Sequence, residues 1–151
     1  MSANATATDQ RQFCTFFLAD LYLGVGVKEV QEVIRYQEMT RVPLASETVS
    51  GLINLRGQIV TAIDLRRRLG LEDRAEGELP MNVVIRSEDG AVSLLVDEIG
   101  DVVEVDDADW EEPPATLRGP ARDLIRGVYK LNGRLLLILD TDRAMCVTAA
   151  S

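Results

Sequence analysis

Histidine is absent from this 151-residue sequence, and cysteine is scarce. Because histidine is the commonest general base and the commonest zinc ligand, its absence argues against the usual acid–base, triad and zinc sites. The two cysteines, Cys14 and Cys146, form no Cys-x-x-Cys pair, which predicts reduced thiols rather than a metal or redox site. Glycine-rich phosphate loops and Gly-x-Ser-x-Gly motifs are also missing. The sequence therefore predicts no enzyme and no cofactor.

Long apolar runs are missing as well. The longest unbroken aliphatic run covers only residues 135–139, far short of the roughly 20 residues that a membrane-spanning helix needs. Residues 2–9 are small and polar, with neither the basic start nor the apolar core of a secretion signal. We therefore expect a cytoplasmic protein without direct membrane insertion, and a disordered N-terminal tail over residues 1–10.

Positive charge is in the minority, and the formal net charge is −9. Such a field repels phosphate backbones, so we expect no nucleic-acid partner. Hydrophobic residues make up 46% and charged residues 27%, which indicates a packed domain rather than disorder. At this length the chain forms one domain or two very small ones.

Short apolar segments alternate with turn residues along the whole chain. Hairpins are predicted where two such segments flank a tight turn: 12–18 with 21–27, 52–55 with 58–63, 82–86 with 91–96, and 124–131 with 134–139. Residues 28–34 have apolar positions at helical spacing, but they could equally be one turn that leads into a strand. Asp64 and Asp140 are placed to cap short helices.

Three polar segments lie between these elements. Residues 71–80 are the best candidate linker, and residues 106–119, with two adjacent prolines, are predicted to be a loop. Residues 97–112 contain nine acidic side chains and no Lys or Arg; they lack the ligand ladder of a calcium loop, so a solvated acidic strand and loop is favoured. The run 66–68 (RRR) is expected to be a solvated helix face.

The sequence also repeats itself. Residues 51–57, Asp64 and Arg67 align with residues 127–133, Asp140 and Arg143 at an offset of 76 positions, and residues 27–34 echo residues 96–103. Each half then reads as a hairpin, an acidic–aliphatic segment, a second hairpin and an Asp-capped helical turn. Because half of this chain is marginal for an independent core, we predict an all-β fold with short helices, in which two small barrels or curled sheets share one core.

One hairpin tip has a candidate interaction residue. Arg56, followed by Gly57, stands at the predicted turn between residues 52–55 and 58–63, where its five N–H donors could reach a partner. An ordinary turn with a solvated arginine is the competing interpretation.

The segment 51–57 (GLINLRG), with Ile59, Val60 and residues 63–65 (IDL), resembles the signature of the CheW family. The resemblance continues through residues 30–33 (VQEV), 96–99 (VDEI) and 135–140, and the predicted domain spans residues 11–147. The CheW family consists of bacterial scaffolds that couple chemoreceptors to the histidine kinase CheA. The resemblance therefore implies two packed five-stranded β-barrels, no catalysis, and recruitment from the cytoplasm to membrane-associated receptor arrays.

The resemblance also implies the partner-binding residues. By matching motif, Arg56 with Gly57 carries the family's functional arginine, Val30 and Glu32 match positions linked to receptor coupling, and Ile99 and Val102 match aliphatic positions of the second barrel. In the family, the receptor's helical hairpin docks near the groove between the barrels, and exposed barrel ends meet the CheW-like domain of CheA.

Three residues depart from the family pattern: Leu23, Gly26 and Thr61 stand where Tyr, Asp and Pro are usual. They occupy packing and turn positions, and they leave the cognate receptor open. An adaptor of a twitching or other non-flagellar chemosensory pathway is an alternative, and a small acidic cation- or ligand-binding β-protein is a more distant one.

Overall fold

The computed structural model describes residues 12–88 and 90–146, and the predicted tail over residues 1–10 lies outside them. The strands are β1 Gln12–Leu18, β2 Leu21–Gly26, β3 Val30–Ile34, β4 Val49–Leu55, β5 Gln58–Asp64, β6 Met81–Ile85, β7 Val92–Val96, β8 Glu98–Glu104, β9 Trp110–Glu111, β10 Ile125–Leu131 and β11 Arg134–Leu139. The short helices are α2 Leu65–Arg68, α3 Pro120–Leu124 and α4 Thr141–Met145, with 3-10 turns η1 Val27–Glu29 and η2 Asp107–Asp109. The predicted all-β class with short helices is confirmed.

The four predicted hairpins all form, as β1–β2, β4–β5, β6–β7 and β10–β11. The open choice for residues 28–34 is resolved as a single 3-10 turn that leads into β3, in keeping with its β-branched residues. The predicted caps also form, because Asp64 accepts a hydrogen bond from the N–H of Arg66 and Asp140 from that of Arg143. The sequence missed β9 and α3, which lie in and just after the predicted loop 106–119.

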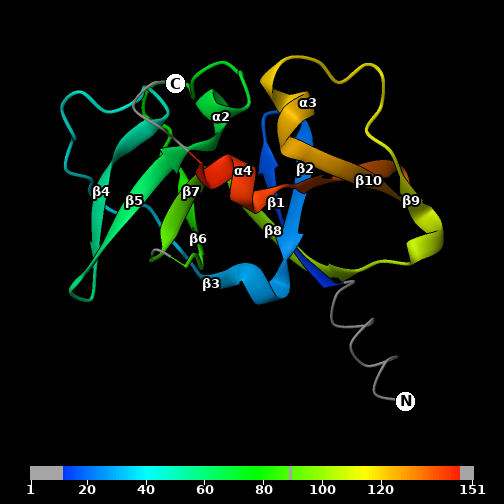
Figure 1. Ribbon diagram of the computed structural model, residues 1–151, viewed down its shortest axis with the longest axis horizontal. Coiled ribbons are helices and arrows are strands. Elements are labelled where there is room, and N and C mark those ends of the chain that lie inside the picture. Colours follow the sequence, from blue (N-terminus) through cyan, green and yellow to red (C-terminus); the bar gives the residue numbers. More distant parts are fainter. Residues whose placement is uncertain (1–11, 89, 147–151) are drawn as a thin grey trace.

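The strands form two sheets, which lie side by side, with α2 and α3 near the top of the view and α4 close to its middle (Figure 1). The six-stranded sheet has the order β8-β1-β2-β11-β10-β9, and the five-stranded sheet has the order β3-β6-β7-β5-β4. Neither sheet is one half of the chain, because β3 and the β4–β5 hairpin join the later β6–β7, while β1–β2 joins the later β8 to β11. The expectation of one barrel per half is therefore corrected to an exchange of strands between halves.

The duplication itself is visible in the backbone. The ladder of β4 with β5 shifts register between Val49 and Gly51, and the ladder of β10 with β11 shifts between Ile125 and Gly127, 76 positions later. The parallel pairings agree as well, since Thr61 of β5 faces β7 and Leu137 of β11, again 76 positions later, faces β2. The two hairpin units are thus copies of one structure.

Successive residues along the strands point alternately into the core of their own barrel and into the core shared by both barrels. One cluster fills each sheet's own barrel: Ile53, Leu55, Val60, Ala62, Val84, Ala91 and Leu95 in the five-stranded one, and Phe13, Tyr22, Val105, Tyr129, Leu136 and Ile138 in the six-stranded one. The largest cluster, which includes Phe16, Leu23, Ile63, Leu94 and Leu137, combines residues of both sheets. The predicted shared core is confirmed, and the period of two is what a strand with both faces covered requires.

Neither sheet is closed by a continuous ladder, and segments of the chain connect its two edges instead. In the five-stranded sheet the segment after β3 returns to the β4 edge, where Thr40 pairs with Leu52 in an isolated bridge. In the six-stranded sheet the chain passes from one edge, β8, through η2 directly to the other edge, β9. The predicted count of five strands per barrel thus becomes five and six, the sixth being the two-residue β9. Among the described residues, no helix has the length and apolar character to cross a membrane.

Candidate functional site

The segment 54–57 (NLRG) builds a tight hairpin tip. Arg56 and Gly57 have φ values of 51° and 89°, the pair of positive angles that matches the twist of flanking strands in a two-residue turn. The N–H of Gly57 donates to Asn54 Oδ1 at 2.9 Å, which holds the turn from within. Because the turn is satisfied by these two neighbours, the Arg56 side chain is 77% exposed and free to make contacts elsewhere.

The contact that Arg56 makes is with Glu32 of β3. Arg56 Nη2 donates to Glu32 Oε2, and this hydrogen bond, with a second from Gln31, lowers the pKa of Glu32. β3 and β4 are the two edges of the five-stranded sheet, so the ion pair joins edges that the ladder leaves apart. Two residues predicted from separate motifs are therefore brought together.

Val30, two residues before Glu32, is half-buried against the core between the barrels. The residue that faces outward on this strand is Val33, at 38% exposure. The pairing of β3 with β6 shifts register between Val30 and Glu32. Val30 therefore lies on the face of Ile85, toward the core between the barrels, whereas Glu32 and Ile34 lie on the opposite face.

The remaining two predicted residues lie on β8, the edge of the six-stranded sheet. Ile99 is half-buried and packs against the core between the barrels, whereas Val102 is 59% exposed. Val102 is therefore not a core residue, and Val30 and Ile99 combine packing with partial exposure.

A second pair of exposed aliphatic residues escaped the sequence analysis. Ile59 at the tip of β5 is 59% exposed, and Leu135 at the tip of β11 is 40% exposed. They are 76 positions apart, the offset of the hairpin repeat, and Val33 and Val102 are 69 apart, the offset of the other repeat. Each barrel thus presents one exposed aliphatic residue on its edge strand and one at its hairpin tip. The two repeat offsets in the sequence could have predicted these matched positions.

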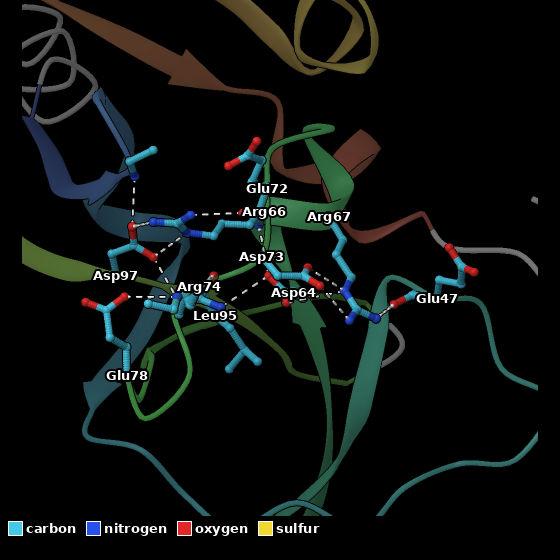
Figure 2. Close-up of polar contacts among 12 residues, drawn as sticks. Glu47, Asp64, Arg66, Arg67, Glu72, Asp73, Arg74, Glu78, Leu95 and Asp97 are labelled. Atoms are coloured by element: carbon cyan, nitrogen blue, oxygen red, sulfur yellow. Dashed lines mark hydrogen bonds and ion pairs between the residues drawn. The ribbon is translucent and has the colours of Figure 1, made fainter.

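The arginine run 66–68 is not the solvated face that was predicted. Figure 2 shows Arg66 directed at Asp97, with Nε 2.9 Å from one carboxylate oxygen and Nη2 2.5 Å from the other. Arg68 donates to three carbonyls at the end of α4, those of residues 143, 144 and 146. Arg67 is 47% exposed and pairs with Asp73. The prediction was wrong because these partners of Arg66 and Arg68 lie 31 to 78 residues away in the sequence.

The predicted linker 71–80 is irregular but tightly held. Arg74 within it is only 10% exposed, and its guanidinium lies 3.3 Å from Asp64 and 2.9 Å from Asp97 (Figure 2). The segment connects α2 to β6 inside one barrel and is therefore not a boundary between barrels. Burial by itself raises the pKa of Asp97, but hydrogen bonds from Arg66 and from the N–H of Ala19 outweigh it and leave this pKa below its usual range.

The acidic stretch 97–112 forms β8, η2 and β9. Its first residue, Asp97, is the partner of two arginines, and Glu111 pairs with Lys130 at 2.6 Å. Over residues 12–88 and 90–146, no group of three or more His, Cys, Asp or Glu side chains is arranged to hold a metal ion. Both cysteines are free.

Comparison with known proteins gives a consistent result. The family model of the CheW-like domain matches residues 12–146. The chain is 29% identical over 140 residues to the chemotaxis protein CheW of Treponema pallidum (strain Nichols), covering 90% of this chain and 82% of that protein. It is 31% identical over 122 residues to CheW of Bacillus subtilis (strain 168), covering 81% and 78%.

A solved structure is similar over nearly the whole chain. The crystal structure of the scaffolding protein TtCheW from Thermoanaerobacter tengcongensis superposes with a TM-score of 0.81 at 25% sequence identity, covering 93% of this chain and 95% of that one.

Proposed function

The chain belongs to the CheW family of chemotaxis scaffolds, and we propose that it couples chemoreceptors to the histidine kinase CheA through one surface on each barrel. As a scaffold it is not an enzyme. It acts in the cytoplasm, recruited to membrane-associated receptor arrays, and its partners are the cytoplasmic tip of the receptor and the CheW-like domain of CheA.

The observation that supports this best is the paired set of exposed aliphatic residues. Val33 with Ile59 on one barrel, and Val102 with Leu135 on the other, are large apolar side chains that the fold leaves uncovered. Apolar contact positions beside charged groups are typical of protein-binding surfaces. A molecule with two such surfaces has the layout that a coupling protein needs.

We assign the two partners by position. Val30 and Ile99 pack on the core between the barrels while staying partly exposed, so they border the junction where a receptor hairpin would dock. The Glu32–Arg56 pair with Gly57 lies at the hairpin tip of the five-stranded sheet and is assigned to the kinase, although the motif match alone linked Glu32 to receptor coupling. The outward-facing Val102 lies on β8 with Ile99 and is assigned to the receptor. Arginine at a protein interface is frequently among the few residues that dominate affinity.

The test is a pull-down of the purified chain with a CheA fragment and a receptor cytoplasmic fragment, separately and together. We expect Ile59→Ser, beside the Arg56 turn, to reduce kinase capture and Val102→Ser to reduce receptor capture, each about tenfold, which corresponds to about 1.4 kcal/mol. Leu44→Ser, at a fully exposed leucine outside both surfaces, is the matched control and should capture both partners normally. A wild-type chain that captures neither partner would overturn the proposal.

A further inference from the structure

Asp97 lies where the chain passes from one barrel to the other. It stands between β7 of the five-stranded sheet and β8 of the six-stranded sheet. Its N–H donates to the carbonyl of Phe17 at 3.0 Å, and its carboxylate accepts from the N–H of Ala19 at 2.8 Å. Since both partners belong to β1 and the β1–β2 turn, Asp97 is attached to the six-stranded barrel.

The same carboxylate is bound by two arginines of the other barrel. Arg66 belongs to α2, which directly follows β5, and Arg74 also donates to Asp64 and to the carbonyl of Leu95 in β7. The four charged side chains are 10–19% exposed, and their two positive and two negative charges balance. Asp97 therefore connects groups held by the five-stranded sheet to groups held by the six-stranded one (Figure 2).

The chemistry of this connection restricts direction as well as distance. Arg66 approaches Asp97 through two nitrogens at 2.9 and 2.5 Å, the planar two-point arrangement of a guanidinium on a carboxylate. Arg74 forms an ion pair with the same carboxylate, its Nε 2.9 Å from Asp97 Oδ1 but without hydrogen-bond geometry. The carboxylate cannot swing without breaking its two-point bond to Arg66 or moving away from the charge of Arg74.

At the second crossing between the barrels, a carboxylate is bound by a hydroxyl group instead of by arginines. Glu29 of η1, between β2 and β3, accepts a hydrogen bond from the hydroxyl of Thr141 at 2.6 Å. Thr141 begins α4, the repeat counterpart of α2, so each crossing is bound by a carboxylate to a helix that follows a hairpin. At η1 the arginine partner, Arg86, donates to the carbonyl of Lys28. Among the contacts described, only the Asp97 crossing has a carboxylate paired with arginines.

We propose that the crossing network, formed by Asp64, Arg66, Arg74 and Asp97, sets the angle between the two barrels and hence between their partner surfaces. Asp97 and Arg74 are positioning residues for coupling: they touch neither partner, and they hold the two surfaces in the relative orientation that simultaneous binding needs. This inference rests on the proposed function for its functional consequence, while its structural part stands alone.

The structural test is to measure amide residual dipolar couplings and fit the two sheets separately. One alignment tensor should describe both sheets of the wild type. In Asp97→Asn the two tensors should differ, and in Arg74→Lys, which keeps the charge but loses the planar fork, they should differ less. The matched control is Asp73→Asn, which neutralises the neighbouring exposed pair with Arg67 and should retain a single tensor.

The functional test compares single with simultaneous binding. We expect the Asp97→Asn variant to capture the CheA fragment and the receptor fragment separately as the wild type does, and to form the three-component complex about tenfold less well, within the usual range for coupling between sites. Equal loss of single and simultaneous binding would show a merely structural role and overturn the proposal, as would a single tensor for the variant. If Asp97→Asn does not fold, Arg74→Lys decides by the same criteria. A wild type that binds neither partner refutes the proposed function but leaves the tensor result intact.

Discussion

At the scale of single residues, Arg56 is the clearest case in which folding and binding separate. The side chain is 77% exposed and its turn is held by Asn54 and the backbone, so Arg56→Ala should melt close to the wild-type temperature. Capture of the CheA fragment should fall about tenfold, because the substitution removes a charged hydrogen-bond donor from the binding surface. Melting temperature and pull-down are measured on the same preparation.

The contact with Glu32 gives this prediction its control. If Arg56 works as part of the ion pair, Glu32→Gln should weaken binding as well, and the double variant should be little worse than Arg56→Ala. Arg118→Ala, at an exposed loop arginine, should bind normally. Loss of melting temperature in parallel with binding would instead mean that Arg56 stabilises the barrel.

Asp97 should make the protein sensitive to acid. Its pKa is lower in the folded chain than the value of about 4 expected when unfolded, so the folded state binds fewer protons in acid. The stabilisation is therefore complete above about pH 4 and is lost as the pH falls through the lower, folded-state pKa. We expect urea unfolding between about pH 5 and pH 3 to show a shallower loss of stability for Asp97→Asn than for the wild type.

At neutral pH the same variant should be less stable. Removing the charge leaves Arg66 without this carboxylate and Arg74 with Asp64 alone. We expect a loss of about 2–3 kcal/mol, somewhat less than the roughly 3–5 kcal/mol for a broken buried pair, because Asp97 is still 19% exposed. Asp73→Asn, at an exposed pair, should lose much less. Parallel pH profiles for Asp97→Asn and wild type would contradict this account.

At the scale of elements, we expect glycine to be required at Gly51 and Gly127, which follow the two register shifts, because another segment of the chain packs directly against each of them. A Cβ on Gly127 would lie 2.2 Å from the Trp110 ring, and one on Gly51 would lie 2.7 Å from the carbonyl oxygen of Thr40. Trp110 and Thr40 belong to the segments that close the two barrels. We expect Gly51→Ala and Gly127→Ala each to lower the free energy of unfolding by about 1–3 kcal/mol.

The comparison variant for these glycines is Gly57→Ala. Nothing lies within 4 Å of a Cβ there, but φ is +89°, so its cost is backbone strain alone, about 1 kcal/mol. Chemical unfolding measures all three, and the fluorescence of Trp110, the single tryptophan, reports whether Gly127→Ala displaces β9. An unchanged Gly127→Ala would show that the closing segment is loosely packed.

At the scale of the whole molecule, strand exchange should make the two barrels one folding unit. Each sheet takes strands from both halves of the chain, and the largest core cluster combines both sheets. Residues 1–80 and 81–151, expressed separately, should each lack the β-sheet circular dichroism of the whole chain, and mixing them should restore it. A folded isolated half would contradict this.

The hairpins, caps and duplication could be predicted from the sequence because they depend on neighbours along the chain. A turn such as Arg56-Gly57 is determined by the φ values its residues can adopt, and an Asp cap such as Asp64 by a hydrogen bond two residues away. The motif resemblance led to Glu32 and Arg56 separately, since each belongs to a local pattern. Their mutual ion pair could not be seen in this way.

Only the tertiary structure decided which strands share a sheet, which charges are buried and which aliphatic residues stay exposed. The exchange of β3 and β8 depends on how two marginal halves bury enough apolar surface together, a property of no single segment. For the same reason Arg66 looked solvated and the linker looked free until Asp97, 31 residues beyond Arg66, was placed beside them. Whether these arginines are solvated or buried in an ion pair thus depends on contacts with residues far away in the sequence.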